Sequence, residues 1–145
     1  MLKPRILLIE DDPGRTAVIE AWLGSTEFAL VAVRSGGQAL GMLQKGSTQA
    51  VAGILLDHDL SNSPITENDL YVSATQLLPL IKRHVRRTVP ILIHSHSVSQ
   101  PLKMQRTLEA GGFSVERIRF EHLTPERFAN WLDQVRDCWD ADEEV

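Results

Sequence analysis

The chain has little of what marks secreted, membrane-bound or repetitive proteins. Cys138 is its only cysteine, so no disulfide framework can form within the chain, and a reducing cytoplasm is the expected compartment. No apolar stretch approaches the roughly 18 residues of a membrane-spanning helix, and no basic-then-apolar leader is visible. The sequence therefore predicts a soluble cytoplasmic protein with no membrane partner.

Positive charge is also scarce. The chain has 15 Lys and Arg against 19 Asp and Glu, a net charge of −4, which argues against direct nucleic-acid binding. The cationic run over 82–87 is interpreted as an exposed helix end, where cations suit the helix dipole. A length of 145 residues fits one domain with one core. We place that domain at residues 1–138 and interpret residues 139–145 as an acidic C-terminal tail.

What the sequence does contain is an alternation of short apolar runs with helix-like stretches. The runs are mostly continuous and rich in β-favouring residues, as expected for strands that helices cover on both faces. A stretch with helical spacing of apolar residues follows each run. Such alternation predicts an α/β fold with a parallel sheet and right-handed crossovers. The five predicted strands are residues 5–9, 28–33, 52–56, 90–93 and 115–120.

The connections add detail to this scheme. The third helix is predicted over 70–85 and the fourth over 101–110, and the fifth begins with Thr124 as a cap before Pro125. Residues 61–69 are polar and aperiodic, which makes them a loop longer than the usual ~2–6 residues of a βα connection, so an active-site lid is one interpretation. The fifth strand is the least apolar, as expected for an edge strand.

Polar residues stand directly after three of the apolar runs. Asp11 and Asp12 follow the first, Asp57 follows the third, and Ser95 follows the fourth. Ligands of an open parallel sheet bind in the crevice beyond the carboxyl ends of its strands. Carboxylates that gather there repel one another unless a cation is present, and Mg²⁺ takes oxygen ligands and binds phosphate oxygens. We therefore expect Mg²⁺, or another divalent metal, on Asp11, Asp12 and Asp57, with Asp59 as a further ligand.

Four segments, taken in order, resemble the motifs of one family. "ILLIEDDPG" resembles a first strand with a metal-binding acidic pair, here Asp11 and Asp12. "GILLDHDL" resembles a third strand with a phosphoacceptor aspartate, here Asp57, and "VPILIHSH" a fourth strand whose switch hydroxyl falls on Ser95. "SGGQALGML" resembles the second helix and its entry. Over nearly its whole length the chain resembles a response-regulator receiver (CheY-like) domain.

That resemblance implies a fold and a role. The fold would be flavodoxin-like, a (βα)5 three-layer sandwich around a five-stranded parallel sheet of order 2-1-3-4-5. The role would be phosphorelay signal transduction by a stand-alone receiver, with Mg²⁺-dependent phosphorylation of Asp57 by a histidine kinase or phosphotransfer protein. Output would pass to a downstream protein partner by contact around helices four and five, where a homodimer could also form.

The chain departs from the family in two respects. The family places a lysine at the end of strand five, and residues 118–123 contain none; Arg119 carries charge there, but arginine is not a simple stand-in for lysine. The second departure is a group of histidines, His58, His94 and His96, close to the acidic residues. Together they could bind a transition metal or act as acid and base on a phosphate ester. "LDHDL" with "IHSH" resembles a variant receiver group proposed to process cyclic phosphates.

Two functions therefore stay open. In the first, Asp57 attacks a phosphoryl donor while the cation neutralises charge, and Ser95 senses the product. In the second, a metal-dependent hydrolase of cyclic or other phosphate esters, the aspartates hold metal and one of the three histidines moves protons. The missing lysine and the extra histidines favour the hydrolase, while the order and spacing of the motifs favour the receiver. The receiver is our principal hypothesis, and the retained acids argue against a receiver-like binding module without chemistry.

Overall fold

The computed structural model describes residues 3–45, 48–60, 72–95 and 102–143. Five strands alternate with five α-helices in these ranges, and a short 3₁₀ turn, η1 (Phe120–His122), follows the last strand. The strands are β1 (Arg5–Ile9), β2 (Ala29–Val33), β3 (Val51–Asp57), β4 (Ile91–Ser95) and β5 (Val115–Arg119). The helices are α1 (Pro13–Leu23), α2 (Gly36–Gln44), α3 (Ala74–His84), α4 (Leu102–Ala110) and α5 (Pro125–Glu143).

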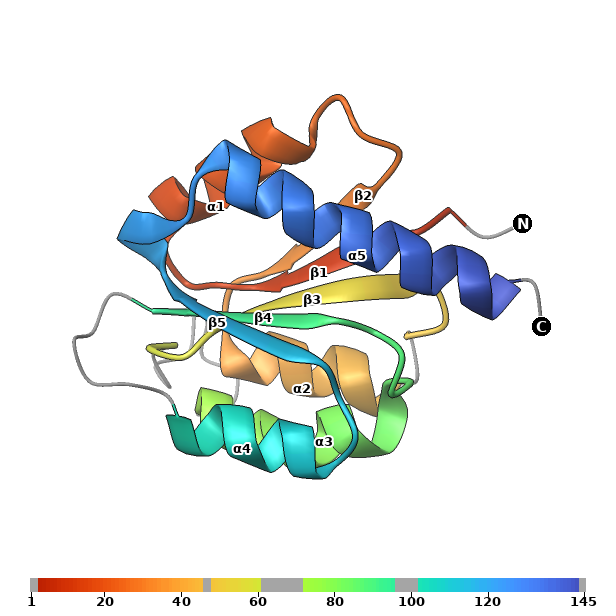
Figure 1. Cartoon of the computed structure of the whole chain (residues 1–145). Helices are drawn as coiled ribbons and strands as arrows, with labels where there is room; N and C mark the ends of the chain where they lie inside the picture. The colour runs from red at the N-terminus through yellow and green to blue at the C-terminus, as the bar shows by residue number, and fades with distance from the viewer. Residues whose placement is uncertain (1–2, 46–47, 61–71, 96–101, 144–145) are drawn as a thin grey trace.

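The strands form one parallel sheet in the order β2-β1-β3-β4-β5, which confirms the predicted flavodoxin-like topology. Figure 1 shows α1 and α5 on one face of this sheet and α2, α3 and α4 on the other. The predicted edge position of the fifth strand is also confirmed. Strand β3 is central and buried at all seven positions, so whatever stands at its carboxyl end lies in the middle of the sheet edge.

Two apolar layers hold the helices against the sheet. Alternate residues of β1 enter each layer: Leu7 and Ile9 pack toward α2, α3 and α4, while Ile6 and Leu8 pack toward α1 and α5. All four of these side chains are fully buried. Each such side chain stabilises the fold by about 1.5–3 kcal/mol relative to an exposed one. This alternation fixes which residue at the end of each strand faces which layer.

Capping residues set where the helices begin. Asp12 caps α1, since its Oδ1 accepts hydrogen bonds from the backbone N–H groups of Gly14 (2.7 Å) and Arg15 (3.1 Å). Ser35 caps α2, and its hydroxyl oxygen accepts from the N–H of Gln38 at 3.0 Å. The segment directly after β1 is therefore the capped start of α1.

Two predicted boundaries differ from the observed ones by two residues or more, and several others differ by one residue. The third helix was predicted from residue 70, but α3 begins at Ala74, because Ser73 and Gln76 form a capping box that ends the extended chain at residue 73. The fourth strand was predicted to end at residue 93, but β4 continues to Ser95. Its last two residues, His94 and Ser95, pair with β3 and β5, so ladder hydrogen bonding outweighs their polarity. The predicted loop at 61–69 lies outside the described residues.

Helix α5 continues past the predicted start of the acidic tail. Trp139 is only 9% exposed and belongs to the layer that α1 and α5 form with the sheet. Within the described part of the chain, no helix combines the length and apolarity needed to cross a membrane.

Candidate functional site

The candidate site lies at the carboxyl edge of the sheet, where three neighbouring strands present polar residues on one face. Glu10, Asp57 and His94 continue the alternate rows of β1, β3 and β4 that face α1 and α5. The register pairs Asp57 with His94, and it pairs Leu8 with Leu55, which sets Glu10 beside Asp57. One potential metal-ligating atom of each lies within 4.8 Å of the other two, and the three residues are 0–1% exposed.

Glu10 is the residue that the sequence interpretation missed. Its Oε1 accepts hydrogen bonds from His94 Nε2 (2.9 Å) and Arg15 Nε (2.7 Å). Its Oε2 accepts from Arg15 Nη2 (3.0 Å) and from the backbone N–H of Asp12 (3.1 Å). Burial alone would raise the pKa of Glu10, but the hydrogen bonds from His94 and Arg15 outweigh it and hold that pKa well below its usual range. Glu10 is therefore a buried carboxylate at neutral pH.

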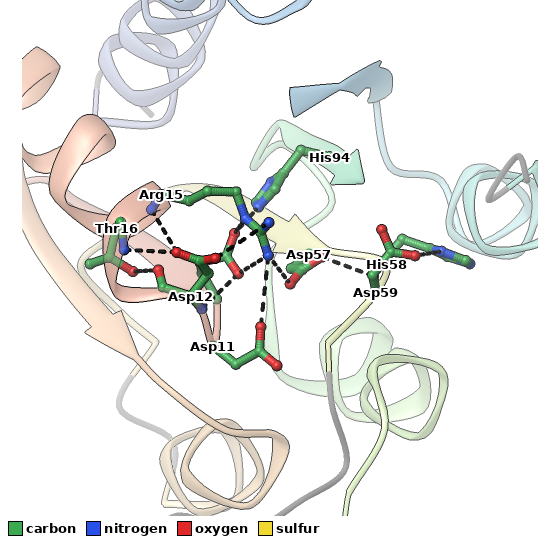
Figure 2. Close-up of polar contacts among 10 residues, drawn as sticks. Asp11, Asp12, Arg15, Thr16, Asp57, His58, Asp59 and His94 are labelled. Carbon is green, nitrogen blue, oxygen red and sulfur yellow. Dashed lines mark hydrogen bonds and ion pairs between the residues drawn. The ribbon is translucent and has the colours of Figure 1, made fainter. Parts of the chain in front are cut away.

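Arg15 projects from the first turn of α1 into this group of acids, as Figure 2 shows. Besides its two bonds to Glu10, its Nη2 lies 3.5 Å from Asp57 Oδ2 and 3.9 Å from Asp11 Oδ1, and its Nη1 lies 3.7 Å from Asp12 Oδ2. The side chain is 12% exposed, and its Cζ sits 5.8 Å from the centroid of the Phe120 ring. One guanidinium group thus stands within 4 Å of four carboxylates.

Asp57 presents its two carboxyl oxygens to different surroundings. Oδ1 accepts a hydrogen bond from the backbone N–H of Asp59 at 2.8 Å, whereas Oδ2 is buried and has no hydrogen-bond partner within the part of the chain that the structure describes. Burial, followed by the contact with Glu10, raises the pKa of Asp57 to about 9, against the lowering effect of the Asp59 N–H and of Arg15. Glu10 and Asp57 are adjacent buried carboxyl groups with one guanidinium beside them, so the pair favours a single negative charge. Glu10 carries that charge, and Asp57 holds a proton at neutral pH.

The predicted aspartates occupy different places around this centre. Asp11 and Asp12 both border Arg15, but Asp12 also caps α1 and its side chain is 46% exposed, against 28% for Asp11. Asp59 contacts His58, with its Oδ1 3.3 Å from His58 Nδ1. The three acids predicted to share an ion, Asp11, Asp12 and Asp57, do gather around a single group, and that group is a guanidinium.

The predicted histidines also occupy different places around the site. His94 points at Glu10 and donates through Nε2 to the ionised carboxylate, while its buried Nδ1 has no hydrogen-bond partner in the described ranges. Its ring centroid lies 5.8 Å from that of Phe120. His58 lines a separate cavity of about 140 Å³ together with Thr75, Leu78, Lys103, Met104 and Thr107, between α3 and α4. His96 lies outside the described residues.

Ser95 and Arg119 pair in register at the ends of β4 and β5. Ser95 is 3% exposed and follows Ile91 and Ile93 along the strand, so alternation places it on the face that α2, α3 and α4 cover. The Arg119 guanidinium pairs with Glu121. In the described part of the chain, the cationic side chain beside Asp57 is therefore that of Arg15. Arg119, which carries charge where the family has its lysine, does not take that place.

These residues fit a divalent cation. Glu10 and Asp57 bring two buried carboxyl groups together. No described residue hydrogen-bonds Asp57 Oδ2, and a buried oxygen without a partner costs free energy. Asp11 adds a third carboxylate at the rim, 3.9 Å from Arg15. An oxygen-rich set with Asp11 at its rim suits Mg²⁺, and the ring of His94 gives the same group one nitrogen.

Solved structures with this fold are numerous. A response-regulator receiver domain protein (CheY-like) from Methanospirillum hungatei JF-1 superposes with a TM-score of 0.69 at 16% identity, covering 100% of both chains. A receiver domain protein from Clostridium thermocellum gives 0.66 at 14% identity, covering 97% of each chain. The receiver domain of a sensor histidine kinase from Pseudomonas aeruginosa PAO1, solved with magnesium in its active-site cleft, gives 0.63 at 21% identity and covers 90% of this chain and 95% of that one.

No protein-family model matches the sequence, and no curated protein matches it. The structural likeness extends over nearly the whole chain and establishes that it has the fold of CheY-like receiver domains.

Proposed function

We propose that this chain is a phosphoacceptor module of a phosphorelay, with Asp57 as the residue that is phosphorylated. The observation that carries the proposal is the buried Oδ2 of Asp57, which lacks a hydrogen-bond partner among the described residues and stands at the carboxyl end of the central strand of a receiver fold. The backbone N–H of Asp59 holds Oδ1, so Oδ2 is the oxygen oriented for attack.

The transfer step follows from this geometry. The ionised Oδ2 attacks the phosphorus of a phosphohistidine on a histidine kinase or phosphotransfer protein. An O–P bond forms, the P–N bond breaks, and the leaving imidazole keeps the electron pair and takes a proton from solvent. Asp57 must lose its proton first, and a nearby cation lowers its pKa and favours that ionisation.

A divalent cation, Mg²⁺ in the first instance, completes the site in this proposal. Glu10, Asp57 and Asp11 are the residues that would hold it, and the magnesium-bound receiver domain from Pseudomonas aeruginosa supports the assignment. Bound there, the ion would neutralise the charge that develops on the transferring phosphoryl oxygens. Asp12 and Asp59 are weaker candidates for ligands of the ion, because Asp12 caps α1 and Asp59 contacts His58.

Signal output is assigned to protein contact. Ser95, at the end of β4 next to β5, is the proposed switch hydroxyl that responds to the new phosphoryl group. The face around α4 and α5 is the proposed surface for a downstream protein or a second copy of the chain. A cytoplasmic location accords with a kinase as donor.

The contacts of His58 and His94 favour the receiver over the hydrolase. His94 Nε2 is committed to Glu10 and its Nδ1 is buried, while His58 contacts Asp59. A general acid or base must reach the substrate proton, and His94 lies beneath the acids in a position that holds Glu10 in place. Among the described residues, no contact favours phosphate-ester hydrolysis.

The test is phosphorylation by small donors. The protein is incubated with Mg²⁺ and acetyl phosphate, or phosphoramidate, and its intact mass is measured. We expect a gain of one phosphoryl group that disappears on alkaline hydrolysis, requires Mg²⁺ and is absent from Asp57→Asn. Asp133→Asn, an exposed carboxylate on α5, is the matched control and should behave as the unmodified protein. An adduct that survives in Asp57→Asn, or no adduct from either donor, would overturn the assignment.

A further inference from the structure

We propose that Arg15 is a tethered cation that occupies the divalent-cation position and must leave before the ion can bind. This inference rests on the proposed function, because it concerns the same cation site. It assigns Arg15 as the residue that sets how strongly the site binds Mg²⁺. The carrying observation is that the guanidinium bonds both oxygens of Glu10 and also stands 3.5 Å from Asp57 Oδ2.

The hydrogen bonds of Glu10 leave no acceptor position for an added ion. A carboxylate has about four lone-pair sites, and the four bonds to Glu10 use them all: two from Arg15, one from His94 and one from the backbone of Asp12. An ion that ligates Glu10 must therefore displace one of these donors.

Arg15 is the donor that can move. The ring of His94 is 1% exposed, and the N–H of Asp12 belongs to the backbone of the capped turn into α1. Arg15 reaches Glu10 on a long side chain that is 12% exposed, from the first turn of α1 at the rim of the site. Asp12 Oδ2, on a side chain 46% exposed, lies 3.7 Å from Arg15 Nη1 and offers the displaced guanidinium a partner toward solvent.

Electrostatic repulsion disfavours the presence of both cations at once. A divalent ion on Glu10 and Asp57 would lie within a few ångströms of the guanidinium in a site that solvent barely screens. The same side chain also lies against Oδ2 of Asp57, the oxygen proposed to attack phosphorus. Departure of Arg15 thus opens both the ion position and the acceptor oxygen, which couples cation binding to access for the phosphoryl donor.

Metal titration of matched variants tests this inference. Mg²⁺ and Mn²⁺ are titrated into the full chain by calorimetry at fixed pH, comparing the unmodified protein with Arg15→Gln, Arg136→Gln and Asp57→Asn. Arg136 is the matched control because it makes a similar two-bond fork to Glu27, at 2.6 and 2.9 Å, away from this site. Arg15→Gln lacks the two charge-assisted hydrogen bonds that compete with the ion. It should therefore bind the divalent ion about 10- to 100-fold more tightly than the unmodified protein. Arg136→Gln should bind as the unmodified protein does, and Asp57→Asn should bind at least about tenfold more weakly.

A second readout follows the side chain itself. In the metal-free protein the Nε–H of Arg15, bonded to Glu10, should give an NMR signal protected from solvent exchange, and saturating Mg²⁺ should abolish that protection. Metal-free Arg15→Gln should also melt at a lower temperature than the unmodified protein and gain more from added Mg²⁺.

The outcomes separate the two proposals. If Arg15→Gln binds Mg²⁺ no more tightly than the unmodified protein while Asp57→Asn weakens binding, Arg15 does not compete and only this inference fails. An Nε–H signal that keeps its protection at saturating Mg²⁺ overturns it equally. If neither ion binds the unmodified protein or Arg15→Gln, the cation site of the proposed function fails as well.

Discussion

Asp57 is the proposed phosphoacceptor, and its burial beside Glu10 also lowers the stability of the folded protein. Its carboxyl is buried beside the ionised Glu10, and its pKa of about 9 lies far above the ordinary 3.8. Between those two values the folded chain keeps a proton that the unfolded chain has released, so unfolding releases a proton. The contribution of Asp57 to the stability of the metal-free protein therefore falls as pH rises from about 4 toward about 9.

Replacing Asp57 with Asn should remove this dependence, because the amide cannot ionise. We expect metal-free Asp57→Asn to be more stable than the unmodified protein by about 1–3 kcal/mol at pH 8, with a smaller difference at pH 5. Urea unfolding at the two pH values measures it, with Asp133→Asn as the variant that should change neither. Equal or lower stability of Asp57→Asn at pH 8 would contradict the raised pKa and the like-charge contact that causes it.

The same residue shows where sequence reasoning stopped. Asp57, Asp11 and Asp12 could be predicted to gather because they stand at strand ends, but the acid that shares the buried cluster of Asp57 is Glu10. Glu10 stands in phase with Ile6 and Leu8, which face the layer that Asp57 and His94 also face, so the alternation contained the missing signal. The position of Arg15 had no such signal, because it depends on the angle at which α1 leaves the capped turn.

At the scale of elements, the strands were predicted more accurately than the helix starts. β1 was predicted at its observed limits, because its apolar run is flanked by charged residues. The polar end of β4 could not be recognised from composition, since its pairing with β3 and β5 exists only in the sheet. The start of α3 was readable from Ser73 and Gln76, a capping box that the prediction overlooked.

Helix α2 offers an internal comparison at this scale, because two of its three glycines have opposite surroundings. A Cβ built on Gly36 would stand 1.8 Å from the carbonyl oxygen of Val72, whereas one on Gly41 would have no atom within 4 Å. Gly36→Ala should destabilise the protein by more than about 2 kcal/mol, because the clash involves backbone. Gly41→Ala should stabilise it by about 0.5–1 kcal/mol through higher helix propensity. Chemical denaturation of both variants checks the pair, and a stable Gly36→Ala would show that α2 does not pack against residue 72.

For the molecule as a whole, the sheet separates two apolar layers, and α5 closes one of them along its length (Figure 1). The row of Glu10, Asp57 and His94 continues the apolar rows of that layer to the sheet edge. Packing of α1 and α5 therefore holds the strands that position the acids, and the site depends on the integrity of this layer.

The last turns of α5 belong to this layer, and their removal provides a test. Trp139 is 9% exposed, the Arg86 guanidinium lies 5.4 Å from its ring centroid, and Asp142 accepts a hydrogen bond from the Thr88 hydroxyl. Truncation after Cys138 removes Trp139 and Asp142, and with them both contacts, so it should cost about 2–4 kcal/mol. Truncation after Glu143 removes none of these contacts and should leave stability unchanged. Urea unfolding of both truncated chains measures the difference. Equal stability would place the end of the folded domain at residue 138, whereas the expected loss extends it through the last turns of the helix.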